Sequence, residues 1–166
     1  QGDSLLPFAY RLYDTYVQEI AQKNLDSILE MDMKTLAILA KMELAGILLD
    51  VEMFSEFSKE AHADIETLTK EIYTLAGKEF TIGSPVQLRE VLFDTLGLSS
   101  VGIKKGKMGY STAASELEKL QGAHPIIEYI EKWREITKLQ NTYIDVLPTL
   151  VHPQTHRIHS TFRQTI

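Results

Sequence analysis

A stripe of apolar residues spaced three and four apart constrains the fold of this 166-residue chain more than any other feature. It begins after Asp50, and this spacing places its members on one side of a long α-helix. Asp50 is a suitable N-cap, and Gly77 fits the left-handed position that ends a helix. The stripe consists of Phe54, Phe57, Ala61, Ile65, Leu68, Ile72 and Leu75.

A stripe of this length leaves two arrangements open. It is either one flank of an intramolecular helical hairpin or the face of a coiled coil with a second chain. The opposite side of the helix is charged and suits solvent in both arrangements. We expect the intramolecular hairpin.

Periodicity and capping residues predict a mainly α fold for the rest of the chain. Ser84 and Gln87 form a capping box around Pro85, so a short helix begins there and ends near Leu96. The segment from Ile28 to Leu44 is apolar on most of its circumference, and we expect it to lie deepest. Further helices are predicted over residues 5–20, 112–120 and 126–147, and alternation predicts one strand over 157–162.

The last predicted helix has an apolar stripe, which we expect to be buried, and a separate polar face. Two cations and short hydrogen-bonding side chains on that face suit the phosphate oxygens and groove acceptors of DNA. The alternative is an ordinary solvated face. The stripe is Ile126, Ile130, Trp133, Ile136, Tyr143 and Leu147, and the polar face is Arg134, Lys138, Asn141, Thr142 and Asp145.

Residues 99–111 contain three glycines and three lysines and no helical stripe. We expect an exposed, mobile loop that lacks apolar anchors. Its glycines allow backbone N–H groups to approach a phosphodiester, while Lys104, Lys105 and Lys107 supply positive charge. The alternative is a surface loop whose lysines serve solubility. The glycine spacing matches neither common nucleotide-binding fingerprint.

The formal net charge of −6 hides an asymmetry between the two halves of the chain. Residues 1–75 carry 14 acidic and 6 basic side chains, a net charge of −8. Residues 76–166 carry 9 acidic and 11 basic side chains, a net charge of +2. An anionic partner is therefore expected to meet the second half.

The sequence offers little for catalysis or metal binding. It has no cysteine, which excludes disulfides, thiolate ligands and a cysteine nucleophile and fits a reducing compartment, the cytoplasm. His152, His156 and His159 are close in sequence, but no nearby acidic residue supplies a fourth ligand, and Arg157 lies among them. We therefore expect no metal site and no catalytic residue in this chain.

From about Leu36 to its end, the chain resembles the family A DNA polymerases. Two matches are specific to that family: REITKLQNTYIDVLP, and SPVQL with the LFDTLGL that follows it. LAKMELAGILLD, STAASELEKL, HPIIEYIEKW and RIHSTFRQT also match, and all occur in the family's order and spacing. Residues 3–35 resemble the end of the preceding 3′–5′ exonuclease-like domain more weakly.

The resemblance implies a thumb subdomain, a mostly helical arm that holds the primer–template duplex behind the active site. The helices beginning at Met33 and Val51 would form a long antiparallel hairpin stem. Residues 80–121 would form a small helical tip, the helix from Ile126 would be the third long helix, and a short β segment would lie at the C-terminus.

The resemblance also implies how the chain is divided. Residues 1–32 would end the exonuclease-like domain and connect it to the polymerase domain. Residues 33–150 would form the thumb, and residues 151–166 would begin the palm.

The family's DNA contacts carry over to eight positions of this sequence. The SPVQL motif and the tip loop would contact the DNA backbone, and the helix motif that begins at Arg134 would approach the duplex. These positions are Ser84, Lys104, Lys105, Lys107, Arg134, Lys138, Asn141 and Thr142.

Four residues depart from the family pattern. Gly83 stands where the family usually has asparagine, so that contact is lost. Gln140 replaces a common lysine and Asn141 a common serine, which weakens the local charge. His156 occupies the usual position of a turn glycine.

The parent protein implied by the resemblance is a DNA-directed DNA polymerase that acts in replication and repair and uses Mg²⁺. The palm aspartates are absent from this sequence, so we expect this fragment to bind duplex DNA weakly and as a monomer, without a cofactor and without catalysis. Its other partners would be the palm and exonuclease-like domains of its own chain. The alternative is a helical protein–protein interaction module that does not bind nucleic acid.

Overall fold

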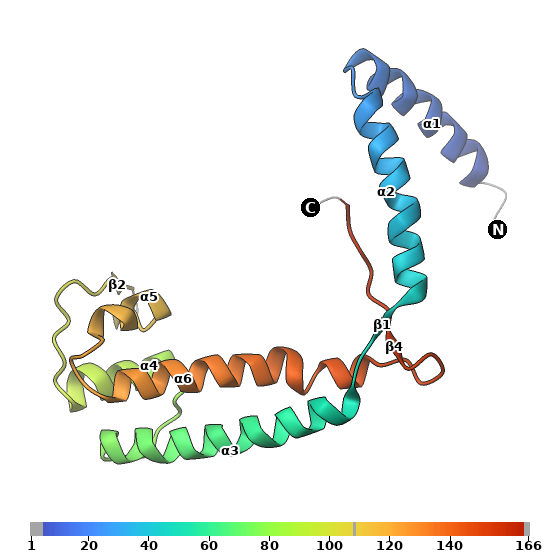
Figure 1. Cartoon of the computed structure of the whole chain (residues 1–166). Coiled ribbons are helices and arrows are strands. Elements are labelled where there is room, and N and C mark those ends of the chain that lie inside the picture. Colours follow the sequence, from blue (N-terminus) through green and yellow to red (C-terminus); the bar gives the residue numbers. More distant parts are fainter. Residues whose placement is uncertain (1–4, 108, 165–166) are drawn as a thin grey trace. The chain divides into compact units, whose positions relative to one another are not determined.

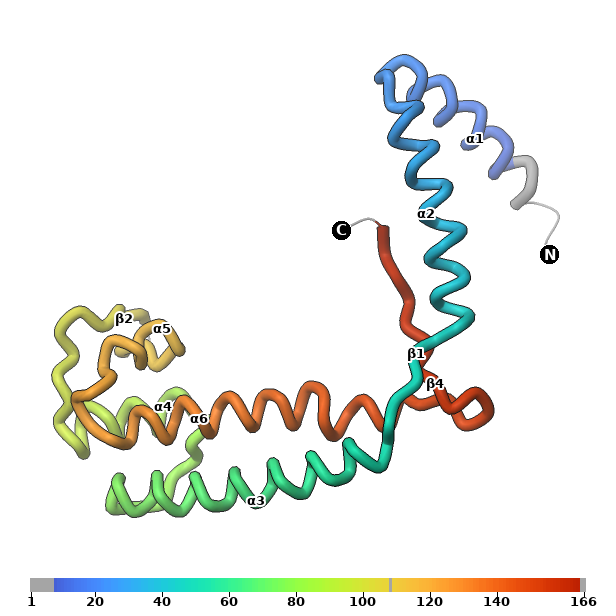
Figure 2. The backbone as a smooth tube through the Cα atoms, in the orientation of Figure 1, coloured from blue at the N-terminus to red at the C-terminus, as the bar shows by residue number. Residues whose placement is uncertain are grey.

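The computed structural model describes residues 5–107 and 109–164 (Figure 1). Helices account for 65% of the chain and strands for 5%, which confirms the mainly α fold class. The chain divides into two compact units. One consists of Gln1–Leu48 with Val151–Ile166, and the other is Leu49–Leu150. Figure 2 traces the backbone within each unit.

The first unit contains two helices and a two-stranded sheet. α1 (Leu5–Gln22) is followed by α2 (Asp26–Ala45), and β1 (Ile47–Leu48) pairs antiparallel with β4 (Arg157–Ile158). The strand predicted over 157–162 is therefore present, shorter than expected, and β1 is its partner. A Cβ on Gly46 would lie 2.9 Å from the Ile158 carbonyl oxygen, so a glycine allows the two segments to approach this closely.

The expectation that the segment from Ile28 to Leu44 lies deepest is wrong. α2 contains no buried residue, and Leu44 is 82% exposed. A helix that is apolar on most of its circumference needs neighbours on several sides to be buried. Among the described residues of this unit, α1, β1 and the C-terminal segment accompany α2, and most of its apolar surface stays uncovered.

The second unit is built on α3 (Val51–Ala76) and α6 (Ile126–Leu139), which pack against each other in antiparallel directions (Figure 1). Both predicted caps of α3 are present. The Asp50 carboxylate accepts a hydrogen bond from the Met53 N–H at 3.0 Å, and Gly77 adopts φ 72°. Of its predicted stripe, Ala61 and Ile72 are buried, whereas Phe57 is 43% exposed.

The antiparallel stem is composed differently from the expected one. It joins α3 to α6, whereas the predicted stem joined α3 to the helix from Met33, which belongs to the other unit. The reason lies in α6, which presents Ile126, Ile130 and half-buried Trp133 at helical spacing to the stripe of α3. Burial of such side chains is the main stabilising contribution at a helix–helix contact.

The tip between α3 and α6 folds around one apolar core. It contains α4 (Pro85–Arg89), the π-helical turn η1 (Glu90–Thr95), the hairpin strands β2 (Lys105–Gly106) and β3 (Gly109–Tyr110), α5 (Ala114–Leu117) and the 3₁₀ turn η2 (Glu118–Leu120). Leu88, Val91, Leu92 and Leu117 are almost completely buried there, together with Ile72 of α3. The tip is thus packed onto the end of the stem.

The last helix is less regular than predicted. α6 ends at Leu139 and continues as the π-helical turn η3 (Gln140–Ile144), and the 3₁₀ turn η4 (Leu147–Leu150) follows. A π turn holds more residues than an α turn and rotates the residues after it. Tyr143, expected in the buried stripe, is consequently 51% exposed, whereas Gln140 is buried.

Candidate nucleic-acid interface

Three cationic side chains line one cleft of about 530 Å³ at the tip. Arg89 comes from α4, Lys107 from the hairpin and Arg134 from α6. None of the described residues that line this cleft is acidic. The other lining residues are Pro85, Gly106, Gly109, Tyr110, Ser111, Thr112 and Ala113.

Arg89 lies against the backbone of the hairpin. Gly109 adopts φ 108°, and a Cβ at that position would lie 2.9 Å from Nε of Arg89. Only a glycine leaves room for the guanidinium at this point without strain. Arg89 was not among the predicted site residues, because its approach to Lys107 depends on a hairpin that the glycine- and lysine-rich pattern did not predict.

Arg134 reaches the same cleft from α6. Its Nη1 donates a hydrogen bond to the carbonyl oxygen of Thr112, and its burial lowers the pKa of the guanidinium from its ordinary value. An arginine remains charged through such a shift. Within the described chain no carboxylate pairs with Arg134, so its positive charge is not neutralised locally.

The loop of residues 99–111, called the lysine loop below, is anchored, contrary to the expectation that it lacks apolar anchors. Ile103 is buried in the tip core. The buried carboxylate of Glu116 accepts hydrogen bonds from the backbone N–H of Lys104 at 3.0 Å and from Nζ of Lys119 at 2.8 Å. Nζ of Lys119 also donates to the carbonyl oxygen of Gly102 at 3.1 Å.

These contacts keep Glu116 ionised. Its pKa is lowered first by the hydrogen bond from Lys119 and then by the backbone hydrogen bond from Lys104, with burial acting in the opposite direction. The negative charge therefore persists at neutral pH, where it holds the base of the loop against α5.

The remaining predicted tip residues lie around this anchored loop. Nζ of Lys105 is 5.3 Å from the ring centroid of Tyr110, which itself packs on Phe93. A cation at this distance over an aromatic face is weakly attracted to it. Ser84 caps α4, and its Oγ accepts from the Gln87 N–H at 3.5 Å.

The Gln87 side chain does not complete the predicted capping box. Its Oε1 accepts instead from the Thr81 N–H at 2.7 Å. This bond fixes the loop that precedes α4.

The polar face predicted on the last helix separates into three groups, of which Arg134 in the cleft is the first. Lys138, Asn141 and Thr142 are exposed to solvent and do not line the cleft. Asp145 instead contacts α3, where its carboxylate accepts a hydrogen bond from Oγ of Ser58 at 2.7 Å. The π-helical turn rotates Asp145 towards α3, so the regular spacing in the sequence does not correspond to one continuous face.

The histidine cluster has a structural role in the first unit. Nδ1 of His159 lies 2.8 Å from the Glu43 carbonyl oxygen, and its Nε2 lies 2.8 Å from Oγ1 of Thr155. Over residues 5–107 and 109–164, no three histidine or acidic side chains gather in a way that could hold a metal ion. In the same residues, no helix has the length and apolar character needed to cross a membrane.

Comparison with known proteins gives consistent matches. The family model for DNA polymerase family A matches residues 51–166. A thermostable DNA polymerase I of Thermus filiformis is 43% identical over 155 residues, which are 93% of this chain and 19% of that protein. DNA polymerase I of Geobacillus stearothermophilus is 39% identical over 158 residues, which are 95% of this chain and 18% of that protein.

One solved structure is also similar. It is the POL domain of Pol1 from M. smegmatis in complex with DNA primer-template and dNTP, with a TM-score of 0.69 and 38% sequence identity. The match covers 77% of this chain and 22% of that chain. This chain therefore spans less than a fifth of the two curated relatives described above.

Proposed function

Because this chain belongs to DNA polymerase family A, we propose that it is the thumb segment of a DNA-directed DNA polymerase and holds the primer–template duplex. The observation that carries this proposal is the cleft lined by Arg89, Lys107 and Arg134. Three cations in a cleft whose described lining includes no carboxylate attract phosphate oxygens, because the field of each adds to that of the others.

The chemistry of the cleft suits a DNA backbone rather than a base edge. Arginine forks bind phosphate oxygens in pairs, and lysine contributes a mobile point charge. Such contacts position a duplex without reading its sequence. Lys138, Asn141 and Thr142 would extend the interface along α6 and η3, and Ser84, Lys104 and Lys105 would extend it around the tip.

Within the parent enzyme this segment would position the duplex for template-directed nucleotidyl transfer. Bound Mg²⁺ would stabilise the charge that develops on the reacting phosphates. Over residues 5–107 and 109–164 no group of histidine and acidic side chains could hold that ion. The contribution proposed for this chain is the alignment of the primer terminus by phosphate contacts.

The division into an exonuclease-like end (1–32), a thumb (33–150) and a palm start (151–166) remains part of the proposal. The monomeric state, the cytoplasmic location and the contacts with the other domains of the parent chain do so as well.

Direct binding tests the proposal. The 166-residue chain is titrated into two fluorescent duplexes of unrelated sequence at low salt, and anisotropy is recorded. We expect similar affinities for both duplexes, and a loss of about tenfold or more in the double variant Arg89→Ala/Lys107→Ala.

The double variant Lys59→Ala/Lys132→Ala is the matched control, because it removes the same charge from exposed positions outside the cleft. Equal losses in the two double variants would mean that only net charge matters, and the cleft would then not be the binding site.

A further inference from the structure

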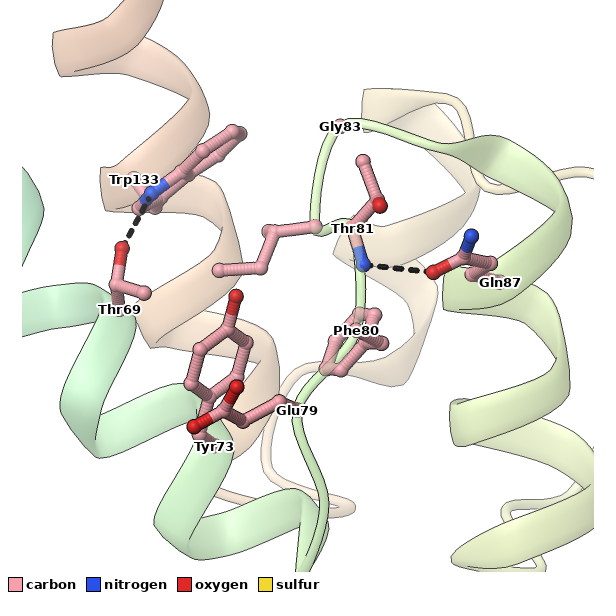
Figure 3. A pocket seen from close by; sticks show the side chains of 9 residues that line it. Thr69, Tyr73, Glu79, Phe80, Thr81, Gly83, Gln87 and Trp133 are labelled. Carbon is pink, nitrogen blue, oxygen red and sulfur yellow. Dashed lines mark hydrogen bonds between the residues drawn. The ribbon is translucent and has the colours of Figure 1, made fainter.

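A second cleft, of about 560 Å³, lies between α3, α6 and the loop that leads into α4 (Figure 3). Three aromatic side chains and one carboxylate line it, and none of its described lining residues is basic. Buried Ile82 also contributes to it. The lining residues are Thr69, Tyr73, Glu79, Phe80, Thr81, Ile82, Gly83, Gln87 and Trp133.

The aromatic walls are fixed in place. Nε1 of Trp133 donates a hydrogen bond to Oγ1 of Thr69 at 3.0 Å, which sets the orientation of the indole. Tyr73 and Phe80 pack with ring centroids 5.9 Å apart. Because the Gln87 side chain also holds the backbone of Thr81, the cleft needs little rearrangement to accept a ligand.

Glu79 carries the charge of this cleft. In the part of the chain that the structure describes, its carboxylate has neither a hydrogen bond nor an ion pair. The nearby lysines are engaged elsewhere, since Lys78 pairs with Glu90 at 2.8 Å and Lys70 with Glu66 at 2.6 Å. A carboxylate without an ion pair therefore lines the same cleft as three partly buried aromatic side chains.

Gly83 leaves space beside the indole. A Cβ at this position would lie 3.7 Å from Cη2 of Trp133, an ordinary contact distance, so an added side chain would begin in contact with the indole. The backbone of Gly83 is not in the left-handed region, which means that other residues fit there without strain.

We propose that this cleft binds the arginine side chain of a partner polypeptide. A planar guanidinium stacks on aromatic faces and also pairs with a carboxylate, and it is more weakly hydrated than the ammonium group of lysine. Charge complementarity favours this occupant over a nucleotide, because Glu79 repels phosphate and the cleft offers no cation to offset that repulsion. The inference goes beyond DNA binding and does not depend on it.

Trp133 makes the proposal directly testable, since it is the only tryptophan in the chain. The chain is titrated with N-acetyl-arginine amide while the Trp133 fluorescence and the NMR signal of its indole N–H are followed. We expect saturable changes with a dissociation constant on the order of 1–10 mM, as befits one cation–aromatic contact and one ion pair.

Two other ligands separate the contribution of the positive charge from that of stacking on the aromatic side chains. N-acetyl-citrulline amide has the same shape without the charge, and we expect it to bind at least about fivefold more weakly. Adenosine tests the cleft as a stacking platform for bases. Equal binding of the arginine and citrulline ligands, or saturation by adenosine with no response to arginine, would overturn the proposal.

Two variants test the roles of Glu79 and Gly83. Glu79→Gln is expected to reduce binding of the arginine ligand about fivefold and to leave citrulline unchanged. Gly83→Asn, the residue usual in the family, is expected to weaken both ligands by covering the indole. Glu128→Gln is the control, because Glu128 is an exposed carboxylate of α6 outside the cleft.

The fold of each variant is checked by circular dichroism. Unchanged arginine binding in a folded Glu79→Gln variant would overturn the role of the carboxylate and with it the proposal.

Discussion

The Glu116 carboxylate accepts a hydrogen bond from the backbone N–H of Lys104, twelve residues earlier, at 3.0 Å. The same oxygen accepts from Lys119, which in turn donates to the Gly102 carbonyl oxygen. A single buried carboxylate therefore ties the start of the lysine loop to α5. The positions of Lys105 and Lys107 depend on this attachment, although neither lysine contacts Glu116.

Removal of the carboxylate is expected to loosen the loop. In Glu116→Leu the N–H of Lys104 loses its acceptor, so hydrogen exchange at residues 102–107 should accelerate by about tenfold or more. Glu118→Leu serves as the control, since Glu118 is exposed and directly follows α5 in the chain. Unchanged exchange in Glu116→Leu would show that Ile103 alone holds the loop.

The same contact predicts a dependence on pH. The pKa of Glu116 is lowered in the folded chain, so its contribution to stability is present above the ordinary carboxyl pKa and is lost as the pH falls through the lowered value. The NMR shift of the Lys104 amide should therefore stay constant near neutrality and move only in acid. A midpoint above the ordinary glutamate pKa would contradict this assignment.

Gly109 and Gly102 allow a matched comparison. Both have positive φ values, of 108° and 82°, but a Cβ would meet Arg89 only at Gly109, and nothing within 4 Å at Gly102. Both alanine variants should lose about 1–3 kcal/mol through backbone strain. The loss of stability measured by thermal unfolding should be larger for Gly109→Ala. This variant should also weaken duplex binding, because Arg89 is displaced. Equal changes in duplex affinity in the Gly109→Ala and Gly102→Ala variants would show that Arg89 does not contribute to the interface.

The packing of the stem predicts where core substitutions matter. Ile72 of α3 is fully buried against the tip core, whereas Leu36 of α2 is 50% exposed. Ile72→Ala should therefore cost about 2–5 kcal/mol in chemical denaturation. Leu36→Ala should change the free energy of unfolding by about 0.5 kcal/mol or less. The reverse order would mean that α2, as its sequence first suggested, forms the core.

The sequence predicted the elements of this fold better than their partners. Asp50, Gly77 and Ser84 mark helix ends through local chemistry, and all three caps are present. The pairing of α3 with α6 was not predicted, because a stripe shows that a helix needs a partner without identifying it. The exposure of α2 was missed for the same reason.

The candidate interface was predicted in part. Lys107 was singled out by the glycine- and lysine-rich pattern and Arg134 by the polar face of the last helix, the resemblance implied both as well, and both line the cleft. Arg89 and Glu116 were not among the predicted contact residues. Both act through contacts with residues that are distant in sequence, which the spacing of a local motif does not reveal. Tyr143 and Asp145 were misplaced because the π-helical turn at 140–144 shifts the helical phase.

The salt dependence of duplex binding tests the central claim most directly. Log affinity is plotted against log salt concentration for the wild-type chain and for Arg89→Ala, Lys107→Ala, Arg134→Ala and Lys138→Ala, with Lys132→Ala as control. Each of the four cations, if it neutralises one phosphate, should flatten the slope by about 0.9 when removed, and the control should leave it unchanged. Slopes equal to that of the wild type in all four variants would show that these side chains are merely solvated and that the cleft does not hold DNA.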